Sequence, residues 1–94
     1  GKTTALVELI RQEVARGLAL RPTADLHRLA GELAGLEGDP ARALEAYEQA
    51  VALDPASAPA LYQVGRLLAE QGQVEEAIER LEQADAIWPD QPEI

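Results

Sequence analysis

Residues 31–55 read GELAGLEGDPARALEAYEQAVALDP, and the same pattern returns 34 positions later at residues 65–89. Ten of the 25 aligned positions are identical, whereas about two or three identities would be expected by chance in a chain rich in Ala, Leu and Glu. A fixed period of this length is typical of solenoids, in which stacked units cover apolar faces that no unit could bury alone. The sequence therefore predicts a stack of repeated units whose functional surface lies on the outside.

Five segments place apolar residues three and four positions apart, which is the spacing of one helix face. The first runs from Thr3 to Leu20 and ends before Pro22, because the residue before a proline is disfavoured in a helix. The later helices have predicted N-caps at Thr23, Asp39 and Ser57 and predicted glycine ends at Gly38 and Gly72. No stretch alternates with period two, so no strand is predicted. The short connections predict antiparallel helical hairpins.

The spacing within each unit resembles the tetratricopeptide repeat (TPR) family, whose 34-residue unit has a small residue, two alanines and a final proline at set positions. These positions hold Gly31, Ala43, Ala50 and Pro55, and then Gly65, Ala77, Ala84 and Pro89. The large residue between the alanines is Tyr47 in one unit and Leu81 in the other. Two family positions differ, because the usual tryptophan is His27 or Leu61 and the usual tyrosine is Ala34 or Leu68. These departures should weaken the core without changing the architecture.

The resemblance implies an all-α fold, an α-solenoid of antiparallel helical hairpins forming a TPR-like superhelix with about five helices. We expect a single domain over residues 1–94, with repeats at 24–57 and 58–91. The helix at 3–20 fits a degenerate second half of an earlier repeat. Because the chain begins with Gly1-Lys2 and contains no Met, we expect it to be a processed product or a part of a longer protein.

Charge and composition exclude several classes of partner. The 94 residues include 17 acidic and eight basic side chains, for a net charge of −9. This balance argues against binding to nucleic acid or to an anionic membrane. The absence of cysteine excludes disulfides and thiolate metal sites but leaves the compartment open, with the cytoplasm slightly favoured.

Candidate catalytic groups are few, since the chain has one His, one Ser, one Lys and no Cys. His27 occupies a packing position of the repeat, and Ser57 is explained as a helix cap. The carboxylates of the last helix are spaced along one helix, as on a solvated face, and do not converge as cation ligands do. We therefore predict no enzyme, no metal and no cofactor.

The opening residues Gly1-Lys2-Thr3-Thr4 are similar to the end of a phosphate-binding P-loop. The first glycine and the strand that precedes such a loop are not in the sequence, so these four residues could not bind a nucleotide by themselves. They leave one alternative open, a helical appendage of a larger nucleotide-hydrolysing protein.

The TPR resemblance implies that the first helix of each unit lines a concave groove for a peptide or helix of a protein partner. The groove positions carried over from the family are Asp25, Arg28, Glu32 and Leu36 in one unit and Tyr62, Arg66 and Glu70 in the next. Tyr62 and Arg66 lead this set, because Tyr and Arg dominate interface hot spots. A salt-bridged surface without function is the alternative. Members that clamp chaperone tails use Lys and Asn here, so that ligand is not expected.

A second surface is predicted on the last helix, where no further helix follows in the repeat pattern. Its apolar side draws on Ile78, Leu81, Ile87 and Trp88. Leaving such side chains exposed forgoes about 1.5–3 kcal/mol each. The sequence thus also predicts possible homo-oligomers, formed through this end or through the N-terminal helix.

Overall fold

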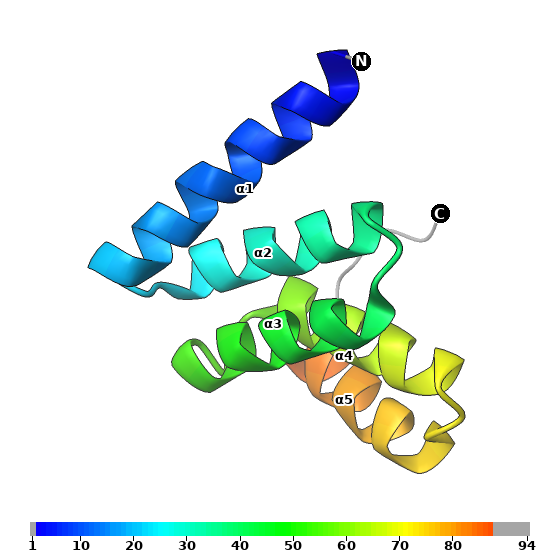
Figure 1. Cartoon of the computed structure of the whole chain (residues 1–94). Helices are drawn as coiled ribbons and strands as arrows, with labels where there is room; N and C mark the ends of the chain where they lie inside the picture. Colours follow the sequence, from blue (N-terminus) through cyan, green and yellow to red (C-terminus); the bar gives the residue numbers. More distant parts are fainter. Residues whose placement is uncertain (1, 88–94) are drawn as a thin grey trace.

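A computed structural model describes residues 2–87, and these residues form five α-helices (Figure 1). In chain order they are α1 (Lys2–Leu20), α2 (Ala24–Leu36), α3 (Pro40–Leu53), α4 (Ala58–Glu70) and α5 (Val74–Ile87). No strand occurs between residues 2 and 87. The all-α prediction is confirmed. Within the same range, no helix is long and apolar enough to cross a membrane.

The predicted N-caps begin three of these helices. The Thr23 hydroxyl accepts a hydrogen bond from the Leu26 amide at 3.1 Å, and the Asp39 carboxylate accepts one from the Arg42 amide at 3.1 Å. At the start of α4, the Ser57 hydroxyl accepts from the backbone amide three residues later at 3.4 Å. Each cap satisfies one of the amide groups that a helix start leaves without a partner.

The two predicted glycine ends are also confirmed. Gly38 and Gly72 have φ angles of 76° and 85°, a left-handed conformation that side chains with a Cβ rarely adopt. The amide after Gly38 donates to the Ala34 carbonyl at 2.9 Å, and the amide after Gly72 donates to the Leu68 carbonyl at 2.9 Å. These bonds close the last turns of α2 and α4, and only three residues separate each of these helices from the next one.

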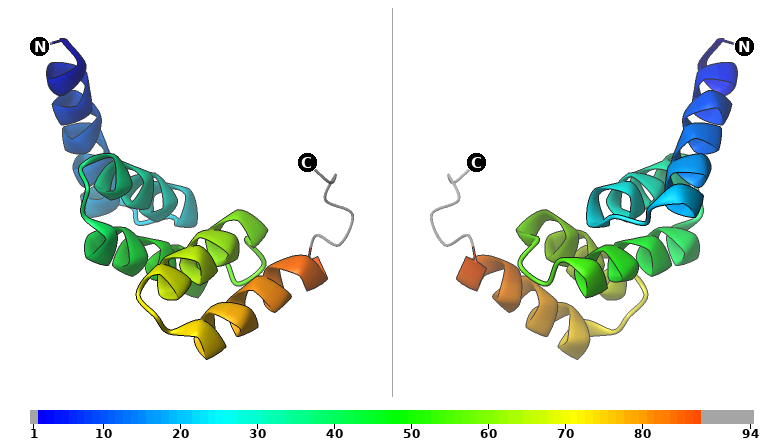
Figure 2. Two further views of the ribbon diagram at one scale, coloured as in Figure 1. Left: turned by 90° about the vertical axis from the view of Figure 1, so that its right-hand side faces the viewer. Right: turned by 90° about the vertical axis from the view of Figure 1, so that its left-hand side faces the viewer.

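The helices stack in sequence order along a curved path (Figure 2). α2 packs on α3 and α4 packs on α5, which makes two antiparallel hairpins, and α3 joins them by packing on α4. α2 and α4 lie toward the inner side of the curve, and α3 and α5 lie toward the outer side. α1 packs on α2 and diverges from it toward the N-terminus (Figure 1).

Both hairpins cross at the glycines that the repeat predicted. A Cβ built on Gly31 would lie 2.9 Å from three ring carbons of Tyr47, and a Cβ built on Gly65 would lie 2.8 Å from Leu81 Cγ. Tyr47 is 4% exposed and therefore belongs to the core. The bare glycine backbone lets the larger side chain of the second helix lie directly across the first.

The core is concentrated around α4. Of its thirteen residues, seven are buried: Ala58, Ala60, Leu61, Val64, Gly65, Leu67 and Leu68. α1, in contrast, buries only Val14, while Leu6 and Leu9 are 57% and 56% exposed. Packing is thus dense between the two repeats and sparse at the N-terminal helix.

Candidate binding groove

The predicted groove residues lie on the first helices of the two hairpins. Asp25, Arg28, Glu32 and Leu36 recur on one face of α2, and Tyr62, Arg66 and Glu70 recur on one face of α4. All of these side chains are accessible to solvent, with Arg28 the most covered at 39% and Asp25 the least at 91%. Both helices lie toward the inner side of the curved stack (Figure 2).

A crevice of about 280 Å³ lies where α2, α3 and α4 meet. Its wall includes Gly31, Gly35, Tyr47, Arg66, Leu67 and Glu70. Two of the predicted groove residues, Arg66 and Glu70, thus line this crevice, and the other five predicted residues do not. Of the two α2 glycines in this lining, Gly31 is covered by the Tyr47 ring, whereas Gly35 has no neighbour within 4 Å of an added Cβ.

Each groove arginine is held by neighbours on its own helix. Arg66 donates to Glu70 Oε2 at 2.6 Å and to Gln63 Oε1 at 2.8 and 3.0 Å. Arg28 donates to Glu32 Oε1 at 3.2 Å and lies 3.7 Å from a carboxylate oxygen of Asp25. Exposed pairs of this kind contribute about 0–1 kcal/mol each. The guanidinium groups are therefore oriented by these pairs but can exchange a carboxylate partner at small cost.

Tyr47 belongs to this site and was predicted only as a packing residue. The pKa of its phenol is raised, chiefly because burial disfavours the charged form and also because of the negative charge of Glu32; Arg66 and Arg28 act in the opposite direction. Tyr47 is therefore within electrostatic reach of both groove arginines, one on α2 and one on α4. The equivalent residue of the second unit is Leu81. The repeat requires only a large side chain at this position, so the phenol of Tyr47 was the feature of the sequence that could have indicated a further role.

The raised pKa of Tyr47 predicts a specific loss of stability in alkali. The folded-state pKa lies above the unfolded value of 10.0, so the stabilisation is complete below about pH 10 and is lost as pH rises through the folded pKa. We expect Tyr47→Phe to remove this part of the alkaline loss. Urea unfolding at pH 8 and above pH 10 measures it, with Tyr62→Phe as the control at a half-exposed tyrosine. Equal alkaline losses in wild type and Tyr47→Phe would contradict the assignment.

His27 lies away from the groove. It is half-buried and lines a different cavity, between α1, α2 and α3. Residues 2–87 contain no cluster of three or more His, Cys, Asp or Glu side chains that could hold a metal ion.

The residues predicted for self-association take different positions. On α5, Ile78 is 50% exposed and Ile87 is 43% exposed, whereas Leu81 is partly covered and packs over Gly65. Trp88 falls outside the described residues. Val74, which was not predicted for this surface, is 56% exposed on the same helix.

Comparison with known proteins agrees with this architecture. A family model for the tetratricopeptide repeat matches residues 36–94. Among solved structures, the crystal structure of MamA superimposes with a TM-score of 0.76 at 23% sequence identity. The match covers 93% of this chain and 49% of the MamA chain, so this chain spans about half the length of that neighbour. No curated protein matches the chain. Because the family model matches more than half of the sequence, the chain belongs to the tetratricopeptide repeat family.

Proposed function

We propose that this chain is a non-catalytic interaction module that binds a peptide or helix of a partner protein along α2 and α4. Tetratricopeptide repeats are generally protein–protein interaction modules, and proteins of this fold are typically scaffolds without catalytic activity. The observation that carries the proposal is the crevice, which Arg66 and Glu70 of α4 line together with Gly31 and Gly35 of α2.

The chemistry of this surface favours a ligand with both an apolar and an acidic group. Tyr62 is 50% exposed and offers aromatic area one turn before Arg66 on the same face. Arg66 can bind a carboxylate through two parallel hydrogen bonds once it releases Glu70. Gly35 of α2 is exposed and a Cβ built on it would have no neighbour within 4 Å, so a ligand backbone could approach closely there. A ligand segment would thus lie across both repeats and contact each of them.

Removal of the two leading groove side chains tests this proposal. We expect Tyr62→Ala/Arg66→Ala to weaken partner capture by about 30-fold or more, because loss of even one hot-spot side chain costs about 2 kcal/mol or more. The measurement is a pull-down with the 94-residue chain as bait, read by quantitative mass spectrometry. Arg80→Ala on α5 is the control, because it removes one arginine away from the crevice.

A second candidate function is self-association, favoured by the exposed apolar side chains at both ends of the stack. Leu6 and Leu9 of α1 and Ile78 of α5 are each at least half exposed. The same double variant separates the two functions. Lost capture with an unchanged oligomeric mass in ultracentrifugation supports the groove. Unchanged capture overturns the groove proposal, and a changed mass would mean that copies associate through Tyr62 and Arg66 and not through the exposed ends.

A further inference from the structure

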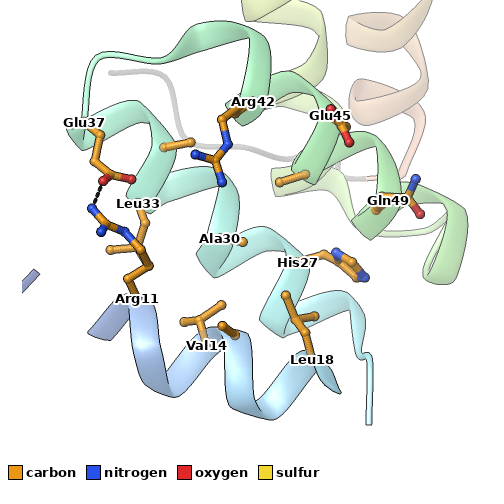
Figure 3. A pocket seen from close by; sticks show the side chains of 13 residues that line it. Arg11, Val14, Leu18, His27, Ala30, Leu33, Glu37, Arg42, Glu45 and Gln49 are labelled. Atoms are coloured by element: carbon orange, nitrogen blue, oxygen red, sulfur yellow. Dashed lines mark hydrogen bonds and ion pairs between the residues drawn. The ribbon is translucent and has the colours of Figure 1, made fainter. Parts of the chain in front are cut away.

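A second cavity, of about 290 Å³, lies between α1, α2 and α3 (Figure 3). It is reached from the other side of α2. Ala30 and Ala34 line it, whereas Arg28 and Glu32 lie on the opposite helix face, since residues four apart share a face and residues two apart do not. The cavity is therefore separate from the groove, and a ligand could bind in it whether or not the groove binds a partner.

The internal repeat explains why this space is empty. Three residues of α2 that line the cavity, His27, Ala30 and Ala34, correspond to Leu61, Val64 and Leu68 of α4 at a shift of 34. Those three aliphatic side chains are 1%, 0% and 3% exposed. The second unit thus fills with Leu and Val side chains the volume that the first unit leaves open.

Seven of the thirteen residues that line the cavity are apolar, and the other six are Arg11, His27, Glu37, Arg42, Glu45 and Gln49. Val14 and Leu18 of α1 face α2 across the cavity (Figure 3). At the rim, Arg11 of α1 forms an ion pair with Glu37 at the end of α2. Arg42 of α3 extends its guanidinium group toward the cavity (Figure 3). Within residues 2–87, Arg42 forms no ion pair, although the Glu45 side chain lines the same cavity.

We propose that this cavity binds a leucine-like side chain of a partner polypeptide, with an adjacent carboxylate of that partner bound by Arg42. The aliphatic group would occupy the volume that Leu61, Val64 and Leu68 fill in the second unit. An aliphatic group that packs against the apolar part of the lining would be removed from water, which favours its binding. A guanidinium at the mouth adds a charge-assisted hydrogen bond to a carboxylate. The partner segment is therefore apolar at one residue and acidic next to it.

The probe for this site is N-acetyl-leucine, which combines an isobutyl group with a carboxylate. We expect saturable NMR shifts in the 94-residue chain at the methyl groups of Ala30, Ala34 and Val14, but not at Ala77 or Ala84 of the second hairpin. N-acetyl-glycine, which lacks the isobutyl group, should cause none of these shifts.

Two variants test the parts of the proposal separately. Ala30→Val/Ala34→Leu inserts the residues of the second unit, should keep the fold by circular dichroism, and should abolish the shifts. Arg42→Gln should weaken the binding of N-acetyl-leucine about tenfold, which is the effect of losing a hydrogen bond to a charged group. The same variant should bind N-acetyl-leucine amide with unchanged affinity. The absence of saturable shifts in the wild type, or shifts that persist in the filled variant, would overturn the site. Equal affinities of wild type and Arg42→Gln for the acid would overturn the role of Arg42.

Discussion

Truncation of Leu61 to alanine should lower the free energy of unfolding by about 2–5 kcal/mol. Leu61 is 1% exposed and packs with Ala58 and Ala84, with partly buried Val51 against the same cluster. Removing its aliphatic group loses the free energy of burial and leaves a void that the surrounding helices can only partly close. Since total stabilities are about 5–15 kcal/mol, this one change could unfold a large fraction of the molecules.

The equivalent position in the first unit is the matched control. His27 is half-buried beside a cavity, so His27→Ala removes few contacts and should cost about 1 kcal/mol or less. Urea unfolding followed by circular dichroism measures both variants. A His27→Ala loss as large as that of Leu61→Ala would show that the two units contribute equally to the core, contrary to the deeper burial of Leu61.

Gly31→Ala and Gly35→Ala should change stability in opposite directions although both residues lie on α2. A Cβ on Gly31 would lie 2.9 Å from three carbons of the Tyr47 ring, and that ring is fixed by burial. Overpacking of this kind costs about 1–3 kcal/mol. A Cβ on Gly35 has no neighbour within 4 Å. There, the lower backbone entropy of alanine in the unfolded chain should stabilise the protein by about 0.4–1 kcal/mol.

Thermal and urea unfolding of the two variants test this contrast. Tyr47→Leu provides a second test, because in the second unit a leucine, Leu81, lies across the equivalent glycine. In a Tyr47→Leu background, Gly31→Ala should cost less, since a flexible branched side chain can move where a ring cannot. Equal stabilisation by Gly31→Ala and Gly35→Ala would mean that the Tyr47 ring does not lie directly across the α2 backbone.

The distribution of the core has a consequence for both proposed sites. The groove lies beside the dense packing between the two hairpins, so its arginines stand on rigid helices. The second cavity lies beside α1, which buries only Val14. A ligand in that cavity would add contacts between α1 and α2 that the chain itself does not supply, and would thereby stabilise the N-terminal helix.

The local features of this protein could be predicted from sequence. The five helices, the caps at Thr23, Asp39 and Ser57 and the left-handed glycines Gly38 and Gly72 depend on a few neighbouring residues. The pairing of helices into hairpins followed from connections too short for any other arrangement. The repeat also indicated where small residues meet large ones, as Gly31 meets Tyr47.

Other features depended on how the helices pack in three dimensions. Sequence placed Tyr47 in the core but not within electrostatic reach of Arg28 and Arg66, because that depends on the distance between α2 and α4 across the hairpins. It assigned Leu81 both to the packing position between the two alanines and to a self-association surface, and the crossing at Gly65 partly covers that side chain. Helix starts and ends are decided by hydrogen bonds within a few residues, so a pattern of residues is sufficient to locate them. The size of a cavity, the exposure of a side chain and the distance between two charges depend on residues from separate helices. Only the tertiary structure brings those residues together.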